Sequence, residues 1–458
     1  MNYIDNENYL FKEAPVGRAI LLLALPTVFS QVITVIYNMA DTFFIGQLGD
    51  PNQVAASTVC MPLFMFMTAL ANLFGVGGAS LVSRSLGAGN RKKAAYCSAF
   101  CTWTTAGVAF LYGLAIWMLK PTLLPILGAN AATWDYTVSY LFWTIAIGAA
   151  PTVLNPMLAH LIRAEGYSKQ ASFGVTFGGI LNMVLDPIFI FVFNLQITGA
   201  AVATLLSNGA AVLYFLCFLY KIRHTSAITV SPRCYSLSEQ IPIEVVVVGL
   251  PSFLISMLAT ISNTMLIHII AGYSNEAVAG MGIAKRIDYL AFAVSQGMTQ
   301  GTLPLIGYNF SSGNLRRMME SVRKLLLACL VVASSLMALM YFGASPITRC
   351  FIDNAETVKY GYKFLRIICL SCLATMMTFF AIMIFQATGR STQPIFLSML
   401  RKGTIDVALM FWFDRIFGID GVAWASPAAE HVSMIIAAIV VVPYLRVLRN
   451  IPTFKQSV

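Results

Sequence analysis

Charged residues are scarce in this sequence. They make up 10% of its 458 residues, whereas 58% are hydrophobic and the mean hydropathy is +0.77. Average proteins contain about 25% charged residues, so this composition excludes a water-soluble globular protein. No long polar block is present that would form a soluble domain. We therefore expect a polytopic membrane protein that lies in a lipid bilayer.

Several chemical motifs are also missing. The sequence contains no GxxxxGK[ST] phosphate loop, which argues against direct use of ATP by this chain. Its nine cysteines are scattered, mostly within apolar runs, so they indicate no disulfide framework. Cys369 and Cys372 form a CxxC pair without a second pair or a nearby histidine. We interpret them as small packing residues rather than as a metal or redox site.

Neither the N-terminus nor the net charge indicates another class of protein. The first eight residues lack the basic start of a signal peptide, so the first apolar run is expected to stay in the protein. The net charge of +10 comes from basic residues that fall between apolar runs. This placement is typical of membrane topology, and no nucleic-acid partner is expected.

Twelve apolar segments are present, each close to or above the roughly 20 residues that a helix needs to cross a bilayer. The predicted fold class is therefore an all-α polytopic membrane protein with twelve transmembrane helices. The segments are expected at 19–45, 54–82, 94–118, 133–159, 168–192, 198–220, 242–270, 278–307, 322–344, 358–386, 394–413 and 422–445.

The loops between these segments alternate in charge. Even-numbered loops are basic, as in the run Arg91-Lys92-Lys93, whereas the first and fifth loops have no lysine or arginine. Basic loops face the cytoplasm. We therefore expect both termini in the cytoplasm and a multi-pass protein of the cell membrane.

The two halves of the chain resemble each other at an offset of roughly 220–225 residues. The longest polar loop divides them, which predicts an N-lobe at 1–220, a cytoplasmic linker at 221–241 and a C-lobe at 242–458. Each half holds six spans, so the repeats are parallel, and parallel lobes usually rock around a central cavity. This organisation is typical of a secondary transporter. The matching pairs are Leu25-Pro26 with Leu250-Pro251, Gly89-Asn90 with Gly313-Asn314, Arg163-Ala-Glu-Gly166 with Gln386-Ala-Thr-Gly389, and Ile197-Thr-Gly with Ile419-Asp-Gly.

The first apolar run contains one acid, Asp41, and one proline, Pro26. An ionisable residue inside a transmembrane helix is costly and by default marks an ion or substrate pathway. A proline frees a backbone carbonyl and lets the helix bend. We therefore expect a switch in this helix, with Asp41 as a solvated residue at the outer membrane surface as the alternative.

A second buried acid, Asp186, lies one helical turn after Asn182, and Thr204 follows in the next span. Together with Asp41 these residues offer carboxylate, amide and hydroxyl groups only. Such a set suits a proton shared between carboxylates, or a hard cation such as Na⁺. The alternative for Asp186 is a helix-end cap near the outer surface.

The second half carries a different set of charges. Asp288 follows Arg286 in the eighth span, the eleventh span contains Arg401, and neighbouring charges can neutralise one another as internal ion pairs. His160 and His268 are lone intramembrane histidines that we interpret mainly as packing residues. The remaining charged side chains of these spans are Lys285, Lys402, Asp406, Glu430 and His431.

Aromatic and methionine side chains are abundant, with 31 Phe, 18 Tyr and 22 Met. Most such residues in a membrane protein face lipid or pack helices. Some are expected to line a cavity for flat lipophilic cations, through apolar contact and cation–π attraction.

The residues along the chain resemble the MATE (multidrug and toxic compound extrusion) family, in particular its bacterial MepA-like and DinF-like types. The resemblance covers nearly the whole chain. It implies a twelve-helix, two-lobe exporter that exchanges H⁺ or Na⁺ for cationic drugs. It further implies a cation site in the N-lobe at Asp41, Asn182, Asp186 and Thr204 with Tyr37 nearby, and a first helix that bends at Pro26. The resemblance rests on Leu25-Pro26, Tyr37-Asn38, Asp41-Thr42, Phe44-Ile45-Gly46, Gly75 to Gly78, Ser83-Arg84, Gly87, Arg163-Ala-Glu-Gly166, Asp186-Pro187, Gly199-Ala-Ala and Gln386-Ala-Thr-Gly389.

One position departs from the family pattern. Family members often carry an Asn-Asn pair where this chain has Ala159-His160. The change removes amides from the N-lobe site and adds a titratable ring, which favours protons over Na⁺. Acids that some branches use in the seventh and tenth helices have no counterpart here, and Asp288 is the nearest C-lobe candidate.

The combined prediction is a monomeric drug/cation antiporter that needs no cofactor beyond its coupling ion. Two alternatives remain open at this point. One is a flippase for a lipid-linked sugar or cell-wall precursor, whose pyrophosphate would need Arg286, Arg401 and Lys402. The other is an intramembrane enzyme using His160 or His268, which parallel repeats do not favour.

Overall fold

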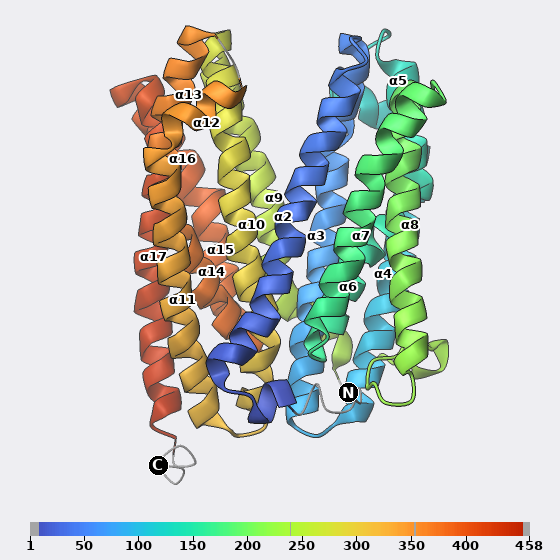
Figure 1. The fold of residues 1–458 in the computed structure, drawn as a ribbon, viewed down its shortest axis with the longest axis vertical. Helices are drawn as coiled ribbons and strands as arrows, with labels where there is room; N and C mark the ends of the chain where they lie inside the picture. Colours follow the sequence, from blue (N-terminus) through green and yellow to red (C-terminus); the bar gives the residue numbers. More distant parts are fainter. Residues whose placement is uncertain (1–8, 239, 352–353, 452–458) are drawn as a thin grey trace. The chain divides into compact units, whose positions relative to one another are not determined.

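The computed structural model describes residues 9–238, 240–351 and 354–451, and these residues form helices joined by short loops, without a strand (Figure 1). The predicted all-α class is therefore confirmed. The elements of the first half are η1 Tyr9–Glu13, α2 Val16–Gly46, α3 Pro51–Gly87, α4 Arg91–Ile126, α5 Trp134–Leu141, η2 Phe142–Ile147, α6 Ala149–Ala164, α7 Ser168–Pro187, η3 Ile188–Val192, α8 Gln196–Ile222 and η4 Pro232–Cys234. Those of the second half are α9 Ile241–Ala271, α10 Asn275–Ser311, α11 Leu315–Phe342, α12 Ala344–Phe351, α13 Ala355–Ile368, α14 Ser371–Ala387, α15 Thr392–Ser398, η5 Met399–Ile405, α16 Asp406–Phe417 and α17 Ile419–Arg449.

Nine helical stretches within the described ranges are long and apolar enough to cross a membrane, and the count reaches ten if α5–η2 and α6, bent by 48°, form one span. The other two predicted spans, 278–307 and 394–413, coincide with α10 and with the interrupted series α15, η5 and α16. Both lie outside this apolar set, and each contains three charged residues. These are Lys285, Arg286 and Asp288 in the first span, and Arg401, Lys402 and Asp406 in the second.

The chain divides into two compact units. Unit 1 consists of residues 9–13 and Phe29–Phe253, and unit 2 consists of Ala14–Val28 and the described chain from Leu254 onward. Relative to the predicted lobes 1–220 and 242–458, the units exchange two segments. The first half of α2 packs in unit 2, and the first half of α9 packs in unit 1. The lobe bounds themselves stay a prediction about the sequence repeat.

Glycines let these exchanged segments approach their neighbours closely. In unit 2, a Cβ atom at Gly297 of α10 would lie 2.5 Å from Val28 Cα of α2, and one at Gly301 would lie 2.8 Å from the Leu23 carbonyl. In unit 1, a Cβ at Gly77 of α3 would lie 2.0 Å from the Val245 carbonyl of α9. Small residues at such spacing permit backbone contact between membrane helices. These contacts explain why the first half of α2 belongs to unit 2 and the first half of α9 belongs to unit 1.

Each unit is built around one central helix. In unit 1, α6 contacts α3, α4, α7 and α8, and in unit 2, α14 contacts α10, α11, α15 and α17. Nearly every residue of α14 is buried. These helices occupy equivalent places in the two sequence repeats, since α6 ends in Arg163-Ala164 and α14 ends in Gln386-Ala387.

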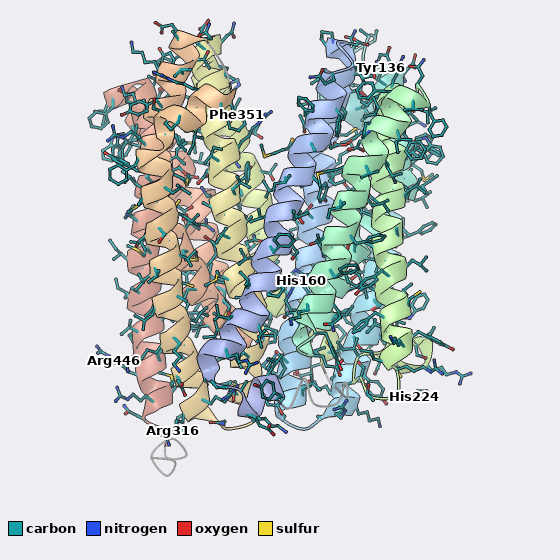
Figure 2. All side chains as sticks on the ribbon, in the orientation of Figure 1. Tyr136, His160, His224, Arg316, Phe351 and Arg446 are labelled. Atoms are coloured by element: carbon teal, nitrogen blue, oxygen red, sulfur yellow. The ribbon has the colours of Figure 1, made fainter. Side chains whose placement is uncertain are left out.

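Labelled residues mark the two ends of each unit in Figure 2. Figure 2 shows Tyr136 and His224 at opposite ends of unit 1. In unit 2, Arg316 and Arg446 lie at the same end, and Phe351 lies toward the other. The start of α11 and the last turns of α17, both of which carry arginines, therefore lie at the same end of unit 2.

Candidate functional site

The predicted acid site lies entirely in unit 1. Asp41 is in the second half of α2, and Asp186 is in the last turn of α7, immediately before Pro187 and the π-helical segment η3. Asn182 stands one turn before Asp186 on α7, and Thr204 faces it from α8. Three helices thus contribute to one site, which is what the 3.6-residue period and the neighbouring spans predict.

The Asn182 amide connects the Asp186 carboxylate to the Thr204 hydroxyl. Its Nδ2 donates to Asp186 Oδ1 at 3.2 Å and to Thr204 Oγ1 at 3.4 Å. The side chain of Asp186 is 0% exposed, whereas Asp41 is half-buried. Asp41 and Asp186 are close enough for their charges to interact. The site therefore contains one buried and one half-buried carboxylate, and the Asn182 amide joins Asp186 to Thr204.

Three acceptor oxygens in this site have no hydrogen-bond donor among the described residues: Asp41 Oδ1, Asn182 Oδ1 and Asp186 Oδ2. A buried polar atom without a partner costs about 1–3 kcal/mol, and more when it is charged. Oxygen atoms of carboxylates, amides and hydroxyls are the ligands of hard cations. The unpaired oxygens therefore fit a proton or a small hard cation.

One tyrosine borders the site. Tyr37 stands one turn before Asp41 on α2 and packs on Gly179 of α7, where a Cβ atom would lie 2.9 Å from Tyr37 Cδ1. Gly179 precedes Asn182 by three residues, so Tyr37 brings the Asp41 segment of α2 against the part of α7 that carries the site.

The amides of Asn155 and Asn208 extend the network, and sequence reasoning missed both. Asn155 Nδ2 on α6 donates to Asn208 Oδ1 at 2.9 Å, and Asn208 Nδ2 on α8 donates to the Thr204 carbonyl at 2.9 Å. Asn208 follows Thr204 by one helical turn, a signal that was available in the sequence. Asn155 lies one turn before Ala159, where the family pattern often carries amides.

The contacts of the His160 ring are with Arg163 and with α3, not with Asp41 or Asp186. Its Nδ1 is 3.4 Å from Arg163 Nη1, and a Cβ atom at Gly75 of α3 would lie 2.7 Å from its ring. Figure 2 shows His160 among the helices of unit 1. The side chain is 5% exposed. The ring packs between α3 and α6, and its departure from the family pattern leaves the amides of Asn155 and Asn208 in place.

The predicted hinge residue, Pro26, lies inside α2, which continues through it to Gly46. Proline cannot donate to the carbonyl of Leu22, four residues earlier. Pro26 precedes by two residues the point, Val28, at which α2 passes from unit 2 to unit 1. In the second half, Pro251 precedes the equivalent point in α9, Phe253, by the same interval.

The charged residues of unit 2 form ion pairs. The Arg401 Nε donates to both carboxylate oxygens of Glu430, at 2.8 and 2.7 Å. Lys402 Nζ lies 3.0 Å from Asp406 Oδ2 and 3.3 Å from Glu430 Oε1. Asp288 pairs with Lys285 at 2.7 Å. All of these residues except Asp406 line a cavity in unit 2.

Several other candidate residues belong neither to the acid site of unit 1 nor to the ion pairs of unit 2. Arg286 and His268 are exposed, and His431 Nδ1 lies 2.8 Å from the Pro427 carbonyl on its own helix. Cys369 and Cys372 are buried, with Cys372 Sγ 3.7 Å from Met340 Sδ. Among residues 9–238, 240–351 and 354–451, no three or more His, Cys, Asp or Glu side chains gather as a metal site.

Comparison with known proteins links the two halves to one family model. The model described as MatE matches residues 26–188 and again residues 251–412. The two matches together cover well over half of the chain, and they begin at Pro26 and at Pro251. The repeat therefore belongs to the family pattern itself.

Curated relatives and solved structures agree over almost the full length. The multidrug export protein MepA of Staphylococcus saprophyticus is 28% identical over 95% of this chain and 96% of its own. MepA of Staphylococcus aureus shows the same identity and coverage. A structure described as the outward-facing conformation of a multidrug resistance MATE family transporter matches with a TM-score of 0.91 at 23% identity, over 97% of this chain and 99% of that chain. The likeness to this structure shows the fold.

Proposed function

Because this chain belongs to the MATE family, whose members are transporters and not enzymes, we propose that it is a secondary active multidrug exporter. It antiports H⁺ or Na⁺ against lipophilic cationic compounds, by alternating access between the two sides of the membrane. Its localisation is the bacterial cell membrane, with both termini in the cytoplasm. It works as a monomer and uses no cofactor besides the coupling ion.

One observation carries this proposal: the unpaired oxygens of Asp41, Asn182 and Asp186 lie together in a buried site of unit 1. No lysine or arginine pairs with either carboxylate at ion-pair distance in the described part of the chain. A buried carboxylate beside a half-buried one favours uptake of a positive charge. The site is therefore suited to load a coupling ion and to release it.

The proposed cycle begins in the outward-open state. H⁺ or Na⁺ binds at Asp41 and Asp186, with the Asn182 amide and the Thr204 hydroxyl as further ligands. Neutralisation removes the repulsion between the carboxylates, and α2 bends at Pro26. The cavity then loses affinity for the drug, which leaves, and the ion is released inward as the lobes rock.

The membrane potential drives this exchange when more ions enter than drug cations leave. Each net positive charge that moves inward releases about 2.3 kcal/mol per 100 mV. Exchange of one ion for one monovalent drug cation moves no net charge, so the ion gradient alone drives it. Exchange of two ions for one drug cation moves one net charge inward, and because about 1.4 kcal/mol corresponds to a tenfold ratio, 100 mV then sustains a substrate gradient of roughly fortyfold.

The proposal is tested by ethidium efflux from proteoliposomes under an imposed H⁺ gradient and, separately, under an imposed Na⁺ gradient. We expect one gradient to drive efflux, and Asp41→Asn and Asp186→Asn to abolish it while both variants still insert. Asp135→Asn is the matched control, since Asp135 is an exposed acid of unit 1. Full efflux in both site variants would overturn the mechanism.

Absence of efflux under either gradient would favour the flippase alternative. Of the cations that alternative requires, Arg401 and Lys402 are held in ion pairs and Arg286 is exposed. A labelled lipid-linked sugar would be the next substrate to test.

A further inference from the structure

Unit 2 contains a cavity of about 50 Å³ between α9, α10, α14, η5 and α17. A buried water needs roughly 10–15 Å³ of such space, so the cavity holds about three to five water-sized groups. It is too small for a drug, but it accommodates one carboxylate. Its polar lining includes Asn263, Lys285, Asp288, Arg401, Lys402 and Glu430.

The positive charges in the lining exceed the negative ones. Lys285, Arg401 and Lys402 face the cavity with two acids, Asp288 and Glu430. Asp406 lies behind the lining, where it accepts from Lys402 at 3.0 Å and from Ser262 Oγ at 2.6 Å. The space itself is therefore bordered by a surplus of cationic donors.

Arg401 has a donor left over. Its side chain is 1% exposed, and only Nε is used by Glu430. Nη1 is buried and has no hydrogen-bond partner among the described residues. A buried charged group without a partner is costly in a membrane protein. Arginine presents its donors as a planar fork that matches the two oxygens of a carboxylate.

The two lysines differ in how far their donors are satisfied. Lys402 Nζ has three acceptors, Asp406, Ser426 and Glu430, at 3.0 to 3.3 Å. Within the described ranges, Lys285 Nζ has one acceptor at hydrogen-bonding distance, Asp288, at 2.7 Å. An ammonium group carries three donors. Lys285 can therefore bind an added anion that Lys402 cannot.

Aromatic rings border the same space. Tyr289 and Phe292 line the cavity, and Phe292 packs edge-on against Phe379 with ring centroids 5.3 Å apart. The Arg401 guanidinium lies 4.6 Å from the centre of the Phe379 ring. Tyr289 is 43% exposed. An aromatic ring outside the cavity can pack on Tyr289 while its acid group points inward.

We propose that this cavity of unit 2 binds the carboxylate of an aromatic acid, through Arg401 Nη1 and Lys285 Nζ, with the ring on Tyr289 and Phe292. The site is separate from the acid site of unit 1, and its occupancy requires no ion gradient. Its ligand class, an anionic aromatic, is opposite in charge to the cationic compounds of the proposed function.

The test is equilibrium binding of radiolabelled benzoate to the full-length protein in detergent, in a gluconate buffer. We expect saturable binding that unlabelled benzoate displaces and that benzamide, the neutral isostere, displaces at least tenfold less well. Chloride should compete only weakly. Complete displacement by an equal concentration of chloride would mean that the site takes an inorganic anion. No saturable binding would mean that water alone fills the cavity, and either result overturns the proposal.

Variants separate the site from general effects of charge. Arg401→Gln with Glu430→Gln removes the donor and its counterion together, and we expect benzoate to bind at least tenfold more weakly. The control is Lys324→Gln with Glu320→Gln, an exposed ion pair of α11, which should leave binding unchanged. If the buried double variant does not fold, Tyr289→Leu replaces it and should weaken benzoate several-fold without changing acetate binding. Asp41→Asn should bind benzoate normally, so a failed efflux assay does not decide this result.

Discussion

The two units place buried charges in opposite arrangements. In unit 1, Asp41 and Asp186 have no basic partner at ion-pair distance among the residues that the structure describes, and three acceptor oxygens of their site find no donor there. In unit 2, Arg401 and Glu430, exposed by 1% and 2%, form a close pair, and Lys402 is held by two acids. The arrangement in unit 1 suits an ion that comes and goes. The arrangement in unit 2 joins its helices and leaves Arg401 Nη1 and Lys285 Nζ for the proposed anion.

The largest contrast is expected in stability. Glu430→Gln leaves the buried Arg401 without its counterion, and loss of one partner of a buried pair costs about 3–5 kcal/mol. Asp186→Asn removes a buried carboxylate that has no cation to lose. We therefore expect the unfolding free energy, measured by denaturant titration in detergent, to fall by about 3–5 kcal/mol in the first variant and by less than about 1 kcal/mol in the second.

A double variant sharpens the same comparison. Arg401→Gln with Glu430→Gln removes both charges, and replacement of a whole buried pair is often close to neutral. It should therefore recover most of the stability that Glu430→Gln loses. Equal losses in Glu430→Gln and Asp186→Asn would show that the two clusters do not differ in the way proposed here.

A smaller effect is expected at the prolines of the two exchanged helices. Pro26→Ala restores a donor for the Leu22 carbonyl and favours the straight helix by up to about 3 kcal/mol, so drug exchange should slow by up to roughly a hundredfold. Drug binding should be unchanged. Stopped-flow efflux and equilibrium binding separate the two quantities.

Two other prolines test whether the bend belongs to the acid site. Pro251 stands at the equivalent point of α9, but no carboxylate follows it in that helix. We therefore expect the Pro251→Ala variant to exchange drug at the wild-type rate. Pro62→Ala, at an exposed proline of α3, is the control. Normal exchange in Pro26→Ala would remove the hinge from the mechanism.

The smallest effect concerns the amides that extend the acid site. Asn208→Ala removes the donor to the Thr204 carbonyl and the acceptor for Asn155. A hydrogen bond contributes about 1 kcal/mol, so the coupling-ion concentration that half-saturates transport should rise about fivefold. Ser139→Ala removes a 2.8 Å bond to Thr198 elsewhere in unit 1 and should leave this value unchanged. Equal shifts in both variants would exclude a specific role for the network.

Much of the fold can be predicted from local patterns. Apolar runs identify the long helices, and the matched motifs around Pro26 and Pro251 identify the repeat. The residues Asn182 and Asp186 share one face because they are one turn apart, and the structure joins them at 3.2 Å. Each of these features depends on residues that are close in sequence or on a repeat that is visible in the chain.

Partners that are distant in sequence could not be predicted in the same way. Arg401 pairs with Glu430, 29 residues away, although Asp406 is much nearer. The π-helical segment η5, Met399–Ile405, contains Arg401 and Lys402, and a π turn changes the direction of the side chains that follow it. Asn155 reaches the network around the acid site from α6 through tertiary packing alone. Spacing on a regular helix carries no information about these contacts.

The exchange of helix segments between the units also constrains biosynthesis. The ribosome makes residues 14–28 early, but their close partners, Gly297 and Gly301 of α10, follow about 270 residues later. At 5–20 residues per second this delay is about 15 to 55 s. The first half of α2 must therefore wait beside incomplete neighbours in the membrane. Neither half of the gene encodes a complete unit, and two separately expressed halves would have to trade segments before either could close its packing.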